Sequence, residues 1–320
     1  MEYKELLRQM IIECKNDADS FLAGNKQDYL YCKERNETYG DTDKNYTNRT
    51  RVCYGLMYGE YSSEIIEDAV RELFETEITS RENESFQGVG INIEMLTALL
   101  LKYNNTEDEK LFERAKNANF DCFLGYNKEY CQKAFEPLDS FSFEDCVIAA
   151  GELGKTDYAC KFVDIFKEQP LGLKEYRMLK SFAIHDTRRM CDRELAVTGI
   201  YEIYMSQLSE SIYDLYDAIS AYVQLLADKG ETDKAADIFI AQSQLFIRFD
   251  RGGYEVGSRL IRDGIKRKNE VWEIILPLIK DNFNQIAPIT YDPLADTAEI
   301  MGEIKLAKKL RKKGEKKMKQ

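Results

Sequence analysis

The sequence predicts an all-α fold, an irregular α-α superhelix of antiparallel helical hairpins, and three observations support it. Only five prolines interrupt the 320 residues, and no sustained alternation of apolar and polar residues, the pattern of a strand, runs through the chain. Apolar residues recur instead at steps of three and four, as they do on one face of a helix. Short polar joints separate these segments, which favours antiparallel packing of neighbouring helices.

The helical segments follow one another along nearly the whole chain. Within residues 63–78, apolar residues at steps of three and four form one stripe: Ile65, Ile66, Ala69, Val70, Leu73 and Phe74. Comparable stripes predict helices over residues 2–22, 92–103, 108–118, 142–153, 157–169, 173–184, 193–207, 211–229, 233–247 and 270–283.

Residues 24–62 interrupt this pattern with a segment rich in tyrosine, asparagine and charge. Loops of this length are usually functional or disordered, although "DYLYCKE" and "RVCYGLMYG" within it suit short helices. Two interpretations remain open. The segment forms a capping pair of helices with half-buried tyrosines, or its tyrosines bind a protein partner. The candidates for partner binding are Tyr29, Tyr31, Tyr54 and Tyr58.

Charge and pattern together divide the chain into three regions. Residues 1–104 form an N-terminal helical region, residues 105–293 an α-hairpin repeat region, and residues 294–320 a basic C-terminal helix or tail. The net charge is −12, but residues 303–320 hold nine Lys or Arg and two Glu, a local charge of +7. The rest therefore carries −19, and such an acidic body repels nucleic acid and anionic membranes.

A short joint occurs twice, 76 residues apart, with the pattern G-x-T-D-x-A. Its residues are Gly154, Thr156, Asp157 and Ala159 in the first copy and Gly230, Thr232, Asp233 and Ala235 in the second. A phosphate-binding Walker A loop is excluded, because Ala149 stands where that motif needs its first glycine and Glu231 replaces Lys155. The pattern predicts a left-handed glycine that ends one helix, a threonine N-cap, and a small residue where two helices cross.

The second copy, "LLADKGETDKAADIFIAQ", resembles the turn and second helix of a tetratricopeptide-type repeat. Gly230, Asp233, Lys234, Ala235 and Phe239 match the positions of that motif. The preceding helix departs from the family pattern at Val223, where glycine is usual, and no proline closes the unit. The resemblance covers two hairpins, and it implies helical hairpins that present a concave surface to peptides or proteins.

Few residues suit catalysis or metal binding. The single histidine, His185, excludes multi-histidine zinc sites, and the eight cysteines contain no C-x-x-C pair. A half-buried position near a helix end is expected for His185. Residues 41–52 imitate a calcium loop, but Tyr46 and Val52 occupy the places of its glycine and its bidentate glutamate. We expect no metal, no cofactor and no catalytic residue.

Residues 248–268 contain the best candidate for anion binding. Gly252, Gly253 and Gly257 suggest a mobile loop that leads into a helix, whose free amides and nearby cations could hold a phosphate or carboxylate. The candidate residues are Arg248, Arg251, Arg259, Arg262 and Lys266. The alternative is a basic face that pairs with acidic residues of the same chain.

The C-terminal segment mixes an apolar stripe with charge. Ile300, Ile304, Ala307 and Leu310 share one helical face, and lysines surround it: Lys305, Lys308, Lys309, Lys312 and Lys313. Nucleic-acid-binding arms and membrane-surface helices have this character. A solubilising, partly frayed final helix is the other interpretation.

These observations favour a non-enzymatic protein that binds a basic protein or peptide on an acidic concave surface. An adaptor, a regulator, or a bacterial immunity-type inhibitor of a basic toxin or nuclease fits this description. The alternative is a nucleic-acid-associated protein that acts through its tail and residues 248–268, and an enzyme using carboxylates ranks below both. The absence of a long apolar run or a signal-peptide pattern predicts a cytoplasmic protein without a membrane span.

Overall fold

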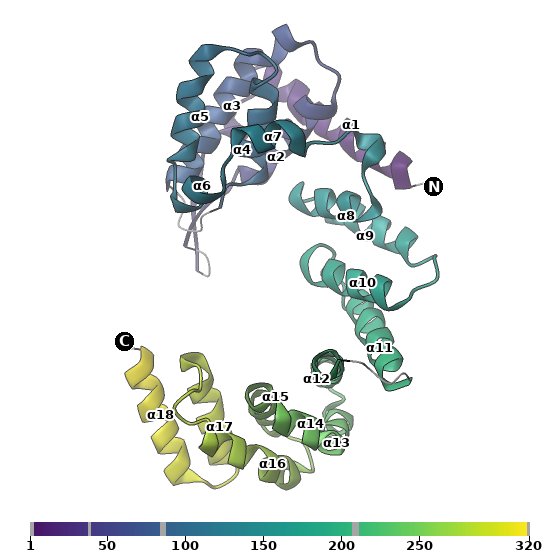
Figure 1. Cartoon of the computed structure of the whole chain (residues 1–320), viewed down its shortest axis with the longest axis vertical. Coiled ribbons are helices and arrows are strands. Elements are labelled where there is room, and N and C mark those ends of the chain that lie inside the picture. Colours follow the sequence, from purple (N-terminus) through teal and green to yellow (C-terminus); the bar gives the residue numbers. More distant parts are fainter. Residues whose placement is uncertain (1–2, 38–39, 84–87, 207–210, 319–320) are drawn as a thin grey trace. The chain divides into compact units, whose positions relative to one another are not determined.

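The structure, a computed structural model, describes residues 3–37, 40–83, 88–206 and 211–318. It confirms the all-α prediction, because helices that follow one another along the chain pack as antiparallel pairs (Figure 1). The chain divides into two compact units. The first comprises Met1–Pro170 and Ser181–Arg188, and the second comprises Leu171–Lys180 and Arg189–Gln320. The divisions predicted after residues 104 and 293 fall inside the first and the second unit, respectively.

Among its described residues the first unit contains nine α-helices, three short 3-10 helices labelled η, one small hairpin, and the end of a tenth α-helix. Its elements are α1 (Tyr3–Leu22), η1 (Gln27–Tyr29), β1 (Lys33–Asn36), β2 (Gly40–Asp43), α2 (Tyr46–Tyr58), α3 (Ser63–Asn83), α4 (Ile91–Leu100), η2 (Thr106–Asp108), α5 (Glu109–Lys116), α6 (Phe120–Gly125), α7 (Lys128–Ala134), η3 (Leu138–Ser140), α8 (Phe143–Glu152), α9 (Thr156–Phe166) and the last residues of α10 (Leu173–His185).

The segment 24–62 differs from the expected pair of short helices. Its second half forms α2, but its first half contains the antiparallel hairpin β1–β2, in which Lys33 lies opposite Asp43. A tertiary contact fastens this hairpin, because the Asp43 carboxylate pairs with the guanidinium of Arg49 on α2. Arg49 is completely buried and its Nε also donates to Glu77 of α3 at 2.6 Å. A buried ion-pair network, which the pattern of the segment does not reveal, therefore decides its structure.

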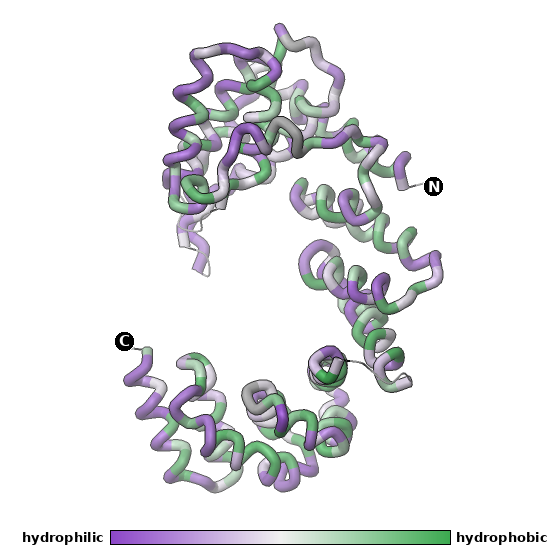
Figure 2. The backbone as a smooth tube through the Cα atoms, in the orientation of Figure 1, coloured by the Kyte–Doolittle hydropathy of each residue, from purple (hydrophilic) through white to green (hydrophobic). Residues whose placement is uncertain are grey.

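The second unit continues the series of paired helices. Its elements are the beginning of α10, α11 (Met190–Ser206), α12 (Ile212–Asp228), α13 (Thr232–Ala241), α14 (Ser243–Arg248), α15 (Asp250–Arg262), α16 (Lys268–Asp281), η4 (Pro288–Thr290), α17 (Tyr291–Ile300) and α18 (Ile304–Met318). One apolar core runs through it from α12 to α18. Hydrophobic and hydrophilic residues alternate around its helices, as the amphipathic pattern predicts (Figure 2).

The two predicted joints have the expected glycine geometry. Gly154 and Gly230 have φ angles of 63° and 78°, which only glycine adopts freely. The amides of Lys155 and Glu231 each donate at 2.8 Å to the carbonyl five residues earlier, as in a Schellman motif. Ala159 and Ala235 are fully buried. The predicted threonine caps are wrong, because Lys155 and Glu231 occupy the N-cap positions and Thr156 and Thr232 begin the helices.

A third joint of the same form precedes the last helix. Gly302 has a φ of 77°, the Glu303 amide donates to the Ala298 carbonyl at 2.7 Å, and Ala307 is fully buried five positions after the glycine. Helix α18 therefore packs against α17 as the second member of a pair. The final segment, expected to be a solubilising, partly frayed helix, is helical over Ile304–Met318, and Lys317 donates to the carbonyls of Asn284 and Ile286.

Candidate functional site

The first unit contains a pocket of about 380 Å³ between α2, α8 and the segment that links α7 to α8. This volume lies near the lower end of the range for small-ligand sites. Ten residues line the pocket: Tyr54, Tyr58, Phe135, Glu136, Ser140, Phe141, Asp145, Ile148, Ala149 and Glu152. Four of them are aromatic, three are acidic and none is basic. We call this feature the acidic aromatic pocket.

Regular structure positions the walls of the pocket. Tyr54 and Tyr58 lie one turn apart on α2, with ring centroids 5.9 Å apart. The ring of Phe141 stands perpendicular to that of Tyr58, also at 5.9 Å. On α8, a capping box between Ser142 and Asp145 fixes the first turn. The helix then presents one face to the cavity, since Asp145, Ile148, Ala149 and Glu152 are spaced at steps of three and four.

Glu152 has the most unusual environment among the acids of the pocket. Its Oε2 accepts a hydrogen bond of 2.8 Å from the Tyr54 hydroxyl. Burial raises the pKa of its carboxyl in spite of this bond, and the charge of Asp186 adds to the effect. The pKa of Glu94 on α4 is also raised, first by burial and then by the charge of Glu152. Burial partly removes both carboxylates from water, and no cation among the described residues forms an ion pair with either of them.

Replacing Glu152 with glutamine tests whether its buried negative charge lowers the stability of the fold. The raised pKa means that the folded chain holds this proton to a higher pH than the unfolded chain, so ionisation of Glu152 weakens the fold. We expect Glu152→Gln to raise the free energy of unfolding at pH 7, because glutamine still accepts from Tyr54 without a charge. The gain should vanish as the pH falls below 4.5, the ordinary value for glutamate.

Denaturant unfolding at pH 7 and pH 4 measures this difference. The matched control is Glu168→Gln, which removes one charge from an exposed residue outside the pocket and should leave stability nearly unchanged. A loss of stability in Glu152→Gln at pH 7 would show that the carboxylate is stabilised by its surroundings.

The four predicted tyrosines fall into two groups. Tyr54 and Tyr58 line the acidic aromatic pocket. Burial raises the pKa of Tyr54 well above that of a free tyrosine and the pKa of Tyr58 to about 12, so both hydroxyls stay protonated near pH 7. Tyr29 is buried beside Phe21, and Tyr31 is half-buried outside the pocket. Little of the Tyr29 ring is exposed for a partner to touch.

The predicted glycine-rich loop of residues 252–257 is wrong, because these residues lie inside helix α15. The glycines permit close packing instead. A Cβ atom at Gly257 would lie 2.5 Å from Ile275, and one at Gly253 would lie 2.6 Å from the Phe246 carbonyl oxygen. The helix begins at Asp250, so the glycines offer no free helix N-terminus to an anion.

Two of the five predicted anion-binding residues form ion pairs with aspartates of the same chain, and two others are exposed to solvent. Arg259 contacts Asp228 at 2.5 Å and Lys266 contacts Asp233 at 2.9 Å. Burial acts to raise the pKa of Asp228, but the hydrogen bonds from Arg259 and Arg193 hold it below its usual value. Arg248 and Arg262 are exposed, and the side chain of Arg251 lies outside the described residues. The structure therefore does not gather the five candidates into one site.

The last helix presents its lysines away from its packed face. Ala307, Leu310 and Gly314 are buried against the preceding elements. Ile300 and Ile304 flank the joint and remain about half exposed, so they do not extend the predicted apolar stripe. Lys313 is only partly exposed and donates to the Asn284 side chain. Five exposed lysines occupy the opposite face of the helix: Lys305, Lys308, Lys309, Lys312 and Lys316.

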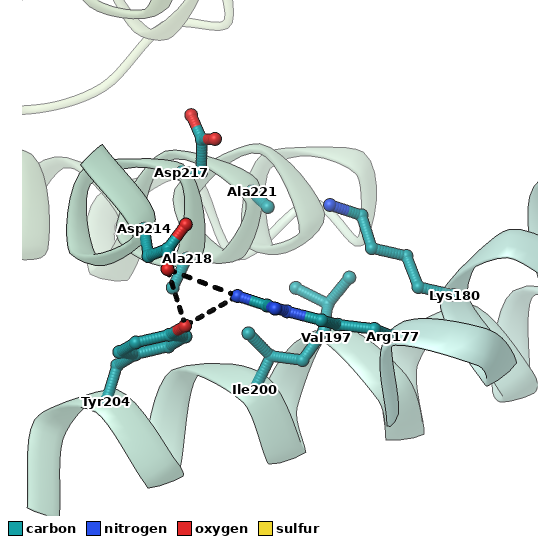
Figure 3. A pocket seen from close by; sticks show the side chains of 9 residues that line it. All are labelled: Arg177, Lys180, Val197, Ile200, Tyr204, Asp214, Asp217, Ala218 and Ala221. Atoms are coloured by element: carbon teal, nitrogen blue, oxygen red, sulfur yellow. Dashed lines mark hydrogen bonds and ion pairs between the residues drawn. The ribbon is translucent and has the colours of Figure 1, made fainter. Parts of the chain in front are cut away.

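A second pocket, of about 300 Å³, lies among α10, α11 and α12 in the second unit (Figure 3). Arg177 donates to the Tyr204 hydroxyl at 2.7 Å and contacts Asp214 at 3.3 Å, and Tyr204 donates to the same Asp214 oxygen at 3.2 Å. Lys180 and Asp217 add one charge of each sign. This pocket has two basic and two acidic residues, so its charge favours neither cations nor anions, in contrast to the acidic aromatic pocket.

The residues that the structure describes offer little support for metal binding or for a reactive cysteine or histidine. No three His, Cys, Asp or Glu side chains in this part are placed to hold a metal ion. Five cysteines are buried, and burial raises the pKa of Cys14 and Cys146 to about 12. His185, expected to be half-buried, is exposed. Within the described ranges, no helix has the length and apolar character needed to cross a membrane.

Comparisons with known proteins give no family. No protein-family model, no curated protein and no solved structure matches the chain. The geometry and charge of the sites themselves must therefore indicate the function of the chain.

Proposed function

We propose that this chain is a non-catalytic binding protein whose acidic aromatic pocket takes part of a basic protein or peptide. An adaptor, a regulator or an immunity-type inhibitor would work in this way. The observation that carries the proposal is the lining of the pocket, in which aromatic rings and three carboxylates meet without any Lys or Arg. Aromatic faces and carboxylates both attract cations.

The charge of the rest of the chain supports a basic partner. Outside the final 18 residues the sequence carries −19. A field of this sign accelerates the approach of a basic protein and slows that of an acidic one. Association should therefore weaken as salt rises, because exposed charges are screened over about 8 Å at physiological ionic strength.

The joints support a helical-repeat architecture of the tetratricopeptide type. Gly154 and Gly230 end their helices in the left-handed conformation, and the small Ala159 and Ala235 follow where two helices cross. Repeats of this kind use rigid helix pairs to present binding surfaces for peptides.

The lysine face of α18 favours the second candidate function, which is binding of nucleic acid. Five exposed lysines lie on the face opposite the packed one. Exposed lysines of this kind suit contact with phosphates regardless of sequence. Arg259 and Lys266 add less to this surface than expected, because each already pairs with an aspartate.

A capture experiment with matched charge variants separates the two functions. The full chain, a variant with the five α18 lysines changed to glutamine, and a Glu136→Gln/Glu152→Gln variant are immobilised and exposed to host lysate. Truncation at Gly302 is unsuitable, because it would uncover the apolar surface of α17 that α18 covers. Bound protein and nucleic acid are identified, and the captured protein is then purified and titrated at low and high salt.

We expect one basic protein to be retained by the full chain and by the lysine variant, and to bind the pocket variant at least tenfold more weakly. Its affinity should fall with salt. Retention of nucleic acid that disappears in the lysine variant would instead support the second function and overturn the first.

A further inference from the structure

We propose that the acidic aromatic pocket binds the guanidinium group of an arginine side chain carried by the partner. This inference rests on the proposed function and names the chemical group that the site recognises. Four features of the pocket lead to it: the angle between its rings, the state of Glu152, the face of α8, and the use of the nearby cations.

The rings form a corner that suits a flat cation. Tyr58 makes an edge contact with Phe141 at an interplanar angle of 90°, and it is tilted by 48° from Tyr54. A cation within about 6 Å of a ring centroid is attracted to the ring face. Guanidinium is planar and weakly hydrated, so it stacks on one ring while its edge remains free to donate hydrogen bonds. An ammonium group is compact and more strongly hydrated, and it gains less from such a corner.

Glu152 supplies the acceptor for that edge. Tyr54 donates to its Oε2 at 2.8 Å, so Oε1 remains to accept from a ligand. Burial raises the pKa of this carboxyl, and no cation among the described residues forms an ion pair with it. Hydrogen bonds from an ionised donor to a carboxylate are about twice as strong as neutral ones. The tyrosine bond also fixes the orientation of the carboxylate before the ligand arrives.

The apolar residue between the two acids of α8 can contact the aliphatic stem of an arginine side chain. Ile148 is 43% exposed and lies between Asp145 and Glu152 on the helix. The two acids are seven residues apart, which is about 10 Å along an α-helix. The aliphatic stem of an arginine can pack on Ile148 while its charged end reaches Glu152. Asp145 is partly engaged, since its Oδ2 accepts from the Ser142 amide at 2.7 Å.

Two cations of α1 contact the wall of the pocket but do not fill it. Lys4 donates to the carbonyl oxygens of Asp139 and Phe141, at 2.7 and 2.5 Å. Arg8 pairs with the Asp139 carboxylate at 3.1 Å. Both hold the segment around η3 in place, and neither belongs to the lining. Among the described residues, no Lys or Arg forms an ion pair with Glu136, Asp145 or Glu152, so the lining can accept a cation from a ligand.

The experiment uses three small probes that share one backbone. They are the N-acetyl methylamides of arginine, lysine and citrulline, of which citrulline matches arginine in shape but has no charge. Each is titrated into the full chain with labelled tyrosine rings, and ring resonances are followed by NMR. Single Tyr→Phe variants assign the resonances of Tyr54 and Tyr58. We expect saturable shifts at these two rings with the arginine probe, binding several-fold weaker with lysine, and none with citrulline.

Two variants test the assigned contacts. Glu152→Gln should weaken binding of the arginine probe about tenfold, the scale of one hydrogen bond to a charged group. Tyr58→Leu should weaken it several-fold, because it removes a ring face that attracts the cation. Glu168→Gln should leave it unchanged. Thermal melting confirms that each variant is folded, and Glu152→Gln should be at least as stable as the parent chain at pH 7. Equal binding of citrulline, or full affinity in Glu152→Gln, would overturn the assignment.

The titration with the arginine probe and the capture experiment can fail independently of one another. If the chain retains a basic protein but the arginine probe produces no shift, the guanidinium assignment is wrong and the proposed function stands. If the probe binds at Tyr54 and Tyr58 while no basic protein is retained, the site recognises arginine but the proposed function is wrong.

Discussion

Replacing Arg49 with methionine is expected to destabilise the first unit by about 3–5 kcal/mol, the usual effect of removing one partner from a buried ion pair. Arg49 has no exposed surface. Its guanidinium joins Asp43 of the hairpin to Glu77 of α3, and it also donates to the Tyr29 carbonyl at 3.3 Å. Methionine fills much of the same space but leaves two buried carboxylates without their cation.

Hydrogen exchange of the amides in α2, α3 and α4 measures this loss, because it reports the stability of these helices directly. The hairpin amides should also exchange faster, since Asp43 accepts from the amides of Cys32 and Asn45 and would lose the cation that pairs with it. The control is Arg35→Met. Arg35 pairs with Asp41 at 3.0 Å, but its side chain is 74% exposed, so a change of at most about 1 kcal/mol is expected. Equal effects of the two variants would contradict a structural role for the buried network.

Replacing Gly55 with alanine is expected to destabilise the packing of α1 on α2 by about 1–2 kcal/mol. Alanine normally stabilises a helix relative to glycine by up to about 1 kcal/mol. Here the added Cβ would overlap the carbonyl oxygen of Cys14 and lie 2.8 Å from the Cβ of Ala18. Overpacking of this kind costs about 1–3 kcal/mol. Because one obstacle is backbone, it cannot move aside by rotating a side chain.

The matched control for this variant is Gly151→Ala in α8. A Cβ there would lie 2.6 Å from Oδ1 of Asp186, the end of a side chain that can rotate away. We expect a small effect of either sign in Gly151→Ala and a clear loss in Gly55→Ala, measured as the shift in midpoint of thermal unfolding. A Gly55→Ala variant as stable as the parent would show that α1 and α2 can separate without loss.

The elements that could be predicted from the sequence are those that depend on near neighbours. Helix α3 follows from the periodicity of Ile66, Val70, Leu73 and Phe74, and the joint at Gly154 follows from a glycine after an amphipathic segment. Such features need only local hydrogen bonds and one buried face.

Elements that depend on distant residues could not be predicted in this way. The strands "KERN" and "GDTD" have little β propensity, and the second ends at Asp43, whose partner Arg49 is also bonded to Glu77, 28 residues further along the chain. The glycines of α15 resemble a loop in the sequence, but packing against Phe246 and Ile275 requires them within a helix. In each case a tertiary contact overrides the local preference.

The acidic aromatic pocket contains some residues that the sequence pattern indicates and others that only the tertiary structure reveals. Tyr54 and Tyr58 stand out in the sequence because the segment around them is rich in tyrosine. Glu152 does not stand out, because it lies 98 residues from the tyrosine to which it is bonded. The spacing of Asp145, Ile148, Ala149 and Glu152 was the available signal, since it places two acids on one face of a predicted helix with apolar residues between them.

The three glycine joints also bear on how the chain reaches its fold. Each joint at Gly154, Gly230 and Gly302 is closed by hydrogen bonds that span five residues or fewer, and each connects two helices that pack on one another. Closing such short loops costs little chain entropy, and proteins rich in local contacts fold quickly. We therefore expect these helix pairs to nucleate early and independently, so that each can form during synthesis before the residues after it have been added.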